Sequence, residues 1–328
     1  MKKFAVLIPS RNEIWLKKTV EDVLSHMEED SIVTVVLDGP QPDPDLPDDR
    51  RVVTIKLNES IGQRAATNLA ARMSDAEYVF KLDAHCSVDR GFDRKLCESG
   101  AELGELVTQV PSQYNLHVFD WVCDGCQDIT YQGPTPTKCL KCGHTVLHKN
   151  VLWQARKNRL TEIWRFDSDL HFQYWRERER EMRKKAKDDP ATHAKYWDTM
   201  SCLGAAWCLS KKRYFDIGGM DEGHGSWGQM GTELSCKSWL SGGRMVTNRT
   251  TWFAHMFRTQ GGDFSFPYPI THKEQEKARQ YSRNMWNNNL WPQQIRPLSW
   301  LVDHFHPTPG WETAASPAAA IEDSPTKD

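Results

Sequence analysis

The sequence lacks any apolar run long enough to cross a bilayer. Its longest apolar stretches, such as Phe4 to Ile8, are far shorter than the ~20 residues that a membrane-spanning helix needs. The first residues lead directly into strand-like sequence and not into the apolar region of a signal peptide. We therefore expect a protein that has no membrane partner and works in the cytoplasm.

The sequence also lacks an excess of either charge. Its 328 residues carry 42 Lys and Arg against 44 Asp and Glu, a formal net charge of −2. This balance excludes a basic protein that coats nucleic acid with its whole surface, and it excludes a disordered acidic chain. Any polyanion must therefore bind to a local basic patch. The length predicts about two domains, or one large α/β domain with an insertion.

The sequence offers no even set of cysteines for a disulfide framework. It has nine Cys, and four of them form two Cys-x-x-Cys pairs. Two residues between thiolates let both sulfurs reach one ion at ~2.3 Å, and two such pairs complete a tetrahedron. We predict a closed zinc site that folds a small module, whereas the alternative is four unrelated thiols or two disulfides. The predicted zinc ligands are Cys123, Cys126, Cys139 and Cys142.

Short β-branched runs alternate with helical patterns over the first hundred residues. Strands are expected at 4–8, 32–37, 51–57 and 77–82, and helices at 14–26 and 62–73. This alternation predicts an α/β fold, with a mostly parallel sheet and helices on both faces. Ligands bind such sheets at the carboxyl ends of the strands. Three expected strands end in polar sequences there, Pro9-Ser10-Arg11, Asp38-Gly39 and Asp83-Ala84-His85.

The α/β pattern stops near Gln109 and returns at Met200. We interpret the chain as a core that carries two insertions and is followed by a C-terminal segment and a tail. The tail is rich in Ala, Ser and Pro and is expected to be disordered. The expected parts are a core at 1–110 and 199–265, a zinc ribbon at 111–150, a basic, aromatic, helical insertion at 151–198, a segment at 266–312 that packs on the core, and the tail at 313–328.

A candidate metal site lies at the end of the fourth expected strand. Asp83 and His85 stand two residues apart, so both side chains project to the same side. A divalent ion held there could bridge a diphosphate and neutralise the charge that develops as a phosphate leaves. His255 offers a third ligand from an aromatic segment. Asp38 ends the neighbouring strand, although it could instead be a turn residue before Gly-Pro.

Two ordered series of short segments carry a family resemblance. In the first half they are Ile8 to Glu13 (IPSRNE), the strand-end Asp38, Arg64 within 61–68, and Lys81 to Cys86 (KLDAHC). In the second half they are 205–215, 217–221, 226–228, 233–235 and 255–258. In this order they resemble the GT-A glycosyltransferases of the family 2 type and, more narrowly, the polypeptide N-acetylgalactosaminyltransferases, which use an Asp-x-His motif. The resemblance covers about 1–110 and 200–260.

The resemblance implies a Rossmann-like GT-A fold and a metal-dependent transferase that uses a UDP-sugar. It implies Mn²⁺ (or Mg²⁺) held by Asp83, His85 and His255. Asp83 and Glu233 are the candidate catalytic residues. Glu233 could be the base that deprotonates an acceptor hydroxyl, or a structural residue at a helix N-terminus. The residues implied to bind the UDP-sugar are Pro9, Arg11, Glu13, Asp38, Arg64, Asp83, Trp227 and Gly228.

The chain departs from that family in one loop. Where the family reads Trp-Gly-Gly-Glu-Asn-x-Glu, residues 227–233 read Trp-Gly-Gln-Met-Gly-Thr-Glu. Met230 and Gly231 cannot make the hydrogen bonds to sugar hydroxyls that Glu and Asn make, and a site without these groups does not select the same hexosamine. N-acetylgalactosamine is therefore in question as the donor sugar.

The second insertion combines basic and aromatic side chains. Residues 153–187 contain eleven Arg and Lys and six aromatic residues. Such a mixture suits a phosphate backbone with unstacked bases. For the Arg-Glu run from Arg176 to Glu181 the alternative is a solvated helix with short-range ion pairs. The candidate acceptor-binding residues are Arg156, Lys157, Arg159, Lys184 and Lys185.

A zinc ribbon beside a basic element resembles the phage TET-associated DNA glycosyltransferases, which place a sugar on 5-hydroxymethylcytosine. This resemblance implies double-stranded DNA with hydroxymethylated bases as the acceptor, and the cytoplasm of a phage-infected bacterium as the location. One alternative is a transferase for protein or glycan acceptors. Another is a non-catalytic zinc-ribbon DNA-binding protein with a vestigial transferase core. Whether the base is flipped, and whether the anomeric configuration is retained, stay open.

Overall fold

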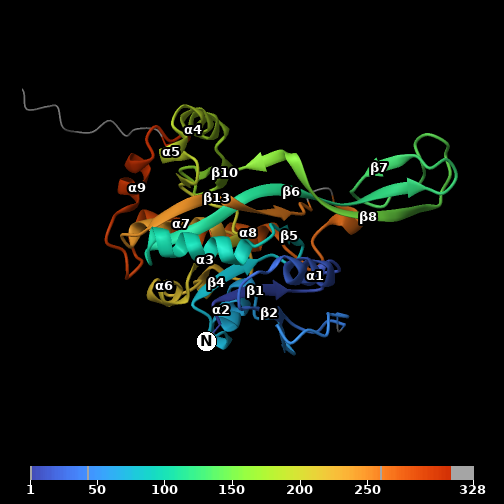
Figure 1. Ribbon diagram of the computed structural model, residues 1–328, viewed down its shortest axis with the longest axis horizontal. Helices are drawn as coiled ribbons and strands as arrows, with labels where there is room; N and C mark the ends of the chain where they lie inside the picture. The colour runs from blue at the N-terminus through green and yellow to red at the C-terminus, as the bar shows by residue number, and fades with distance from the viewer. Residues whose placement is uncertain (1, 43, 259–260, 312–328) are drawn as a thin grey trace, which may run out of the picture.

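The structure, a computed structural model, describes residues 2–42, 44–258 and 261–311. In these ranges, eleven strands form one sheet and two more form a separate hairpin. Helices lie on both faces of the sheet (Figure 1). The predicted α/β class is therefore confirmed.

The first half of the sheet follows the predicted strand and helix pattern. Its parallel strands, in the spatial order β3-β2-β1-β4, are β1 (Phe4–Ser10), β2 (Ser31–Leu37), β3 (Val52–Lys56) and β4 (Tyr78–Leu82). The intervening helices are α1 (Leu16–His26) and α2 (Gln63–Met73). Side chains of β1 alternate between a core layer shared with α1 and another shared with α2. Because both faces are buried, the strand is a continuous apolar run.

The second half of the sheet is mixed in direction. Its elements are β5 (Cys86–Val88), α3 (Phe92–Leu103), β6 (Val107–Cys123), β11 (Tyr196–Asp198), β12 (Ala206–Ser210), α6 (Lys211–Asp216), η1 (Glu222–His224), α7 (Met230–Leu240) and β13 (Arg244–His255). β12 runs antiparallel to β4 and β6, whereas β6 and β13 are parallel. Full parallel order is thus confined to the first four strands.

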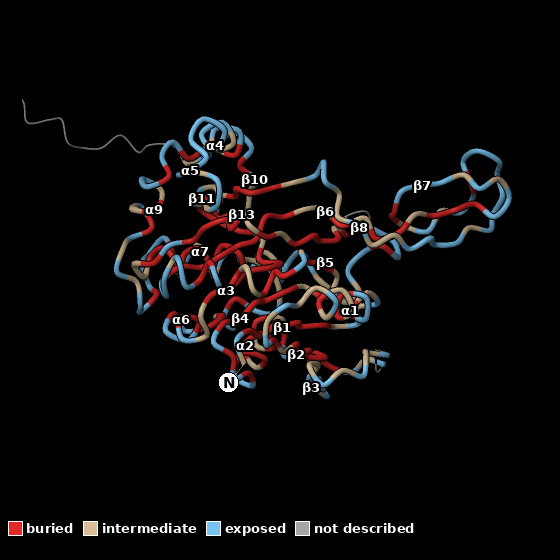
Figure 2. Tube along the Cα trace, in the orientation of Figure 1, coloured by how far each residue is buried: buried red, intermediate tan, exposed pale blue. Residues whose placement is uncertain are grey.

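A long β-ribbon projects from the sheet, and we call residues 113–161 the finger. β6 continues out of the sheet and pairs with β8 (Leu147–Thr161), and β7 (Ile129–Tyr131) joins it near the tip. Figures 1 and 2 show that the finger stands away from the core and is largely exposed beyond its base. At the base, Phe119 and Trp121 pack with Met256 and Phe264 of the core. The finger is therefore anchored by its own aromatic cluster.

The second insertion is helical only in its later part. The prediction of a helical element over 151–198 is wrong for 151–161, which belong to β8. Pairing with β6 determines this conformation, and such long-range pairing overrides local preference. The expected boundary at 150 also falls inside β8. After it come β9 (Trp164–Phe166), β10 (Phe172–Tyr174), α4 (Arg176–Asp188) and α5 (Pro190–His193).

The C-terminal segment packs on the core, as expected. It contains α8 (His272–Asn287) and α9 (Leu298–His304), and η2 (Gly262–Phe264) ends just before it. Trp286 and Leu301 are fully buried in the same hydrophobic cluster as α7. The predicted disordered tail at 313–328 lies outside the described residues. Within the described ranges, every helix is too short or too polar to traverse a bilayer.

Candidate functional site

A cavity of about 340 Å³ lies at the carboxyl ends of β1, β2 and β4. This is the edge of the sheet at which the sequence predicted a site. The predicted donor and metal residues that line it are Pro9, Arg11, Glu13, Asp38, Asp83, His85, Trp227, Gly228 and His255. Arg64 alone among the predicted donor residues is absent from its wall.

The three predicted metal ligands meet at the base of this cavity. Asp83 follows β4, His85 precedes β5, and His255 ends β13, which pairs with β5. The Nε2 atoms of the two histidines are 3.1 Å apart, and Asp83 Oδ2 is 3.3 Å from His255 Nε2. Two ring nitrogens and a carboxylate oxygen that converge in this way form a donor set suited to Mn²⁺.

A second layer of side chains fixes these ligands. Glu13 Oε2 accepts a hydrogen bond from His85 Nδ1 at 3.0 Å, and its other oxygen pairs with Arg258. With its proton on Nδ1, His85 directs the lone pair of Nε2 toward the converging ligands. Burial opposes ionisation of Glu13, but the hydrogen bond and charge of His85, with Arg258, lower the pKa of Glu13. Glu13 therefore orients a ligand, a role that differs from the predicted donor binding.

Asp83 is held from its other side by two polar groups. The ammonium of Lys81, which is fully buried, pairs with Asp83 Oδ1 and donates to the Gly204 carbonyl at 2.9 Å. Gln63 Nε2 donates to the same oxygen at 3.0 Å. Burial raises the pKa of Asp83, but Lys81 and the histidines outweigh it and lower this pKa. Burial lowers the pKa of His255 to about 4, so its ring is neutral and can bind a metal.

Asp38 lines the cavity and also holds a loop in place. Its carboxylate accepts hydrogen bonds from Ser60 Oγ at 2.9 Å, from Ile61 N at 2.7 Å and from Gly62 N at 3.1 Å. These bonds fix the loop that precedes α2. The turn interpretation of Asp38 is not supported, because these three bonds run to residues 60–62 and the same carboxylate lies at the cavity.

Arg64 and Glu233 lie beneath the cavity as a buried ion pair. Arg64 Nε is 2.8 Å from Glu233 Oε2, and Lys237 Nζ is 2.9 Å from Glu233 Oε1. Arg64 also donates to the carbonyls of Gly225 and Gly228. Burial raises the pKa of Glu233, but Lys237 and Arg64 outweigh it and lower this pKa to about 2.

The structure therefore contradicts two predicted roles. Glu233 is fully buried and absent from the cavity wall, so it cannot take a proton from an acceptor hydroxyl there. Arg64 supports the loop that carries Trp227 and does not face the donor directly. The structural alternative for Glu233 accounts for its place at the start of α7.

The loop that departs from the family pattern packs too tightly for the family's side chains. An ideal Cβ on Gly231 would lie 1.9 Å from the Cys202 carbonyl oxygen. An ideal Cβ on Gly204, which has a φ of +86°, would lie 2.9 Å from the Gly231 nitrogen. An Asn at position 231 would therefore require the backbone to move. Met230 and Gly231 both line the cavity, so this wall is less polar than the family's sequence implies.

Several cavity residues escaped the sequence analysis. Phe266, Tyr268 and Arg279 come from the C-terminal segment, and His171 and Phe172 from the second insertion. Arg11 lies over the Tyr268 ring at 6.0 Å, and Trp227 packs edge-on against Phe266 at 5.4 Å. The aromatic residues within 264–268 were the sequence feature that could have indicated a contribution to the cavity. Nothing local in the sequence shows that this segment returns to the strand ends.

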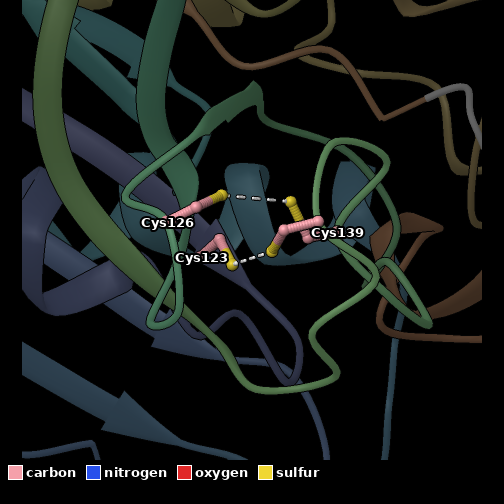
Figure 3. A group of neighbouring side chains, drawn as sticks. Cys123, Cys126 and Cys139 are labelled. Atoms are coloured by element: carbon pink, nitrogen blue, oxygen red, sulfur yellow. Dashed lines mark hydrogen bonds between the residues drawn. The ribbon is translucent and has the colours of Figure 1, made fainter.

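The four predicted zinc ligands gather in the distal part of the finger. Figure 3 shows the sulfurs of the three that it labels, Cys123, Cys126 and Cys139, pointing into one group. The Sγ distances are 3.6 Å for Cys123 to Cys142 and 3.7 Å for Cys126 to Cys139. Four sulfurs at ~2.3 Å from one zinc ion lie about 3.8 Å apart, whereas a disulfide measures about 2.05 Å. The donor set therefore fits zinc.

The rest of the finger is consistent with this assignment. The backbone N–H groups of Cys142 and Lys141 lower the pKa of Cys139 to about 7 and so favour its thiolate. The His144 ring lies against Gly125 and outside the cysteine group. The remaining five cysteines, Cys86, Cys97, Cys202, Cys208 and Cys236, are buried.

The candidate acceptor-binding residues come from two separate elements. Lys157 and Arg159 are exposed on β8, and Arg156 stacks on Tyr131 at 4.9 Å. Lys184 and Lys185 are exposed near the end of α4. The preceding Arg-Glu run is paired within the helix, with 3.2 Å between Arg178 and Glu181 as one example. The solvated-helix interpretation therefore describes that run.

Comparison with known proteins supports the fold. No protein-family model matches the chain. Polypeptide N-acetylgalactosaminyltransferase 10 of Caenorhabditis briggsae is 33% identical over 81 residues, which are 25% of this chain and 12% of that protein. A crystal structure of GalNAc-T7 with UDP, GalNAc and Mn²⁺ superposes with a TM-score of 0.61 at 16% identity, covering 88% of this chain. The GT-A fold is thus confirmed. The chain spans 48% of that solved chain.

Proposed function

We propose that this protein is a metal-dependent glycosyltransferase that transfers a sugar from a UDP-sugar to a hydroxymethylated base in DNA. The convergence of Asp83, His85 and His255 in a cavity at the strand ends carries the first part of this proposal. In a GT-A fold, this edge of the sheet is where a nucleotide ligand is expected. A Mn²⁺ or Mg²⁺ ion held by these residues would stabilise negative charge on the diphosphate.

The remaining cavity residues suit a nucleotide-sugar. Arg11 and Arg279 supply positive charge for phosphate oxygens, and Pro9 and Asp38 lie where uracil and ribose would bind. Trp227 and Phe266 give an aromatic wall next to the loop of Met230. Because that wall lacks the carboxylate and amide of the resembling family, we propose a donor other than UDP-N-acetylgalactosamine.

The finger and α4 support the second part, a DNA acceptor. Lys157 and Arg159 are exposed on the finger, and Lys149 lies over Phe119 at 4.9 Å and over Trp121 at 5.0 Å. Exposed cations among aromatic rings favour a nucleic-acid backbone. The ribbon projects from the core (Figure 1), and such a ribbon can follow a duplex while the cavity receives one base. The similarity to a polypeptide transferase favours a protein acceptor as the second candidate.

Mass spectrometry of hydroxymethylcytosine-containing duplex DNA tests the acceptor. The DNA would be incubated with the protein, Mn²⁺ and a panel of UDP-sugars, with unmodified DNA as the control. A mass increase of one sugar on the modified DNA alone supports the proposal. Transfer to peptides or glycans, and none to DNA, would establish the second candidate instead. DNA binding without release of UDP from any donor would establish a non-catalytic DNA-binding protein.

We also propose that the protein acts in the cytoplasm of a phage-infected bacterium. The cluster of four free thiols suits a reducing compartment, in which a Cys₄ zinc site persists. Phage DNA with hydroxymethylated bases would be available there as an acceptor. Detection of the sugar on DNA from infected cells, and of the protein in the same fraction, would test this location.

A further inference from the structure

One wall of the cavity comes from the second insertion and has no part in the donor site described above. His171 and Phe172, from the hairpin of β9 and β10, line this wall. The side chain of His171 is 51% exposed, and Phe172 is half-buried. Neither residue contributes to the metal cluster. A histidine and an aromatic ring thus face the same cavity as the three ligands.

The His171 ring is held by a network of hydrogen bonds although it is exposed. Asp167 Oδ1 accepts from the backbone N–H of His171 at 2.9 Å, and Asp167 Oδ2 accepts from Gln173 Nε2 at 3.1 Å. The same Gln173 nitrogen lies 3.2 Å from His171 Nδ1. A carboxylate can only accept hydrogen bonds. Asp167 therefore fixes the Gln173 side chain with its NH₂ group toward both Asp167 and His171. Nδ1 of a neutral His171 is then the acceptor, and Nε2 carries a proton that it can donate.

The hairpin of β9 and β10 is anchored by the core and by the C-terminal segment. Leu170 is fully buried next to His171, and Arg165 donates to the Pro309 carbonyl at 2.7 Å. Trp311 Nε1 donates to the Phe166 carbonyl at 3.0 Å. The C-terminal segment therefore holds the hairpin in place. A donor group on such a support is placed before any ligand arrives, which lowers the entropic cost of binding.

We propose that His171 and Phe172 form the subsite for the acceptor base. This inference rests on the proposed function, since it takes a nucleobase as the acceptor. The ring of Phe172 offers a stacking face, and His171 Nε2–H offers a donor to an oxygen or nitrogen at the edge of a pyrimidine. Because these residues share the cavity with the metal ligands, we take the acceptor base to leave the helix when it binds here. The acceptor base is therefore flipped out of the duplex.

Variants of these two residues test the subsite. We would measure transfer to a hydroxymethylcytosine duplex and, without DNA, release of UDP from the UDP-sugar. For His171→Ala and Phe172→Ala, kcat/KM for DNA should fall about tenfold more than UDP release does. His171→Gln should recover much of the loss, because its Nε2–H₂ can donate from a similar place. The control is Phe215→Ala, which removes a 39%-exposed ring on α6, outside the cavity wall.

A second measurement addresses base flipping. A mismatch opposite the hydroxymethylcytosine should raise kcat/KM of the wild-type protein, because an unpaired base costs less to extrude. Equal rates on matched and mismatched duplexes, or alanine variants that transfer at the rate of Phe215→Ala, would overturn the subsite and leave the DNA acceptor standing. A wild-type protein that releases UDP but modifies no DNA would instead overturn the proposed acceptor, and the subsite with it.

Discussion

At the scale of single residues, the site depends on charges that are paired with one another below the cavity. His85 and His255 offer ring nitrogens to the metal position, while Glu13 and Lys81 hold the ligands through hydrogen bonds and ion pairs. Each of these groups is removed from water, so a substitution affects both chemistry and folding. Histidine variants separate the two effects best, because Glu13 keeps its ion pair with Arg258 and Asp83 keeps its ion pair with Lys81 when a histidine is removed.

We expect His85→Ala and His255→Ala each to lower UDP-sugar turnover by more than about a hundredfold, because each removes one of three metal ligands. The measurement is UDP release with Mn²⁺, together with Mn²⁺ affinity by electron paramagnetic resonance. Thermal unfolding should stay near that of the wild type. In contrast, Asp83→Ala should also lower Tm, since it leaves the buried Lys81 ammonium without its carboxylate. If both histidine variants bind Mn²⁺ as tightly as the wild type does, the assignment of these residues as metal ligands is wrong.

Glu233 should behave as a structural carboxylate. Glu233→Gln leaves Arg64 and Lys237 buried without their shared anion, and such a loss costs about 3–5 kcal/mol of unfolding free energy. Because the pKa of Glu233 is lowered from 4.5 to about 2, its ionisation stabilises the fold above pH 4.5, and this contribution is lost as the pH falls toward 2. Chemical denaturation across pH measures both effects. A variant with wild-type stability and no transfer would restore the base interpretation.

At the scale of elements, the sequence predicted those strands and metal ligands that a short, local residue pattern determines. The strands β1, β2 and β4 were found because both of their faces are buried, and the cysteine spacing located the zinc ligands. β8 was missed because its pairing partner, β6, lies at a distance in the sequence. Glu233 was misread for a related reason, since the motif shows a carboxylate but not the Arg64 and Lys237 that surround it.

The zinc ribbon should be separable from the catalytic core. Cys123→Ser or Cys139→Ser should release one zinc per chain and unfold the distal finger, because ligation provides folding free energy in a module this small. Metal analysis and proteolysis within 124–146 measure the two effects. UDP release should persist, since the finger is anchored to the core by its own aromatic cluster. If metal analysis finds no zinc in the purified wild-type protein, the assignment of a zinc site is wrong.

The basic residues on β8 and α4 should act on DNA binding only. Replacing Arg156, Lys157, Arg159, Lys184 and Lys185 by Ala should weaken binding to all sequences and flatten its salt dependence, because each lost phosphate contact removes about one unit of counterion release. The measurement is DNA affinity between low and high salt. Replacing Arg178 and Arg180, which pair with Glu181 and Glu177, is the control for loss of charge on α4, where Lys185 also pairs with Glu181. An unchanged salt slope in the fivefold variant would mean that the acceptor binds elsewhere.

At the scale of the whole molecule, three distant segments close one cavity. The strand ends bring the metal ligands, the insertion brings His171 and Phe172, and the C-terminal segment brings Phe266, Tyr268 and Arg279. The finger projects from the same sheet through β6, so a long acceptor can contact it and the cavity together. In the proposed reaction, the core would supply the donor cavity and the two insertions would supply the acceptor contacts.

The most direct test of this account is the metal dependence of UDP release. Purified protein would be stripped of divalent ions at the cavity, supplied with a panel of UDP-sugars, and titrated with Mn²⁺ while UDP is measured. We predict that at least one UDP-sugar yields UDP, that the rate saturates with Mn²⁺, and that His255→Ala abolishes the response. UDP release at the same rate without divalent ions, or no release from any UDP-sugar at saturating Mn²⁺, would contradict the account.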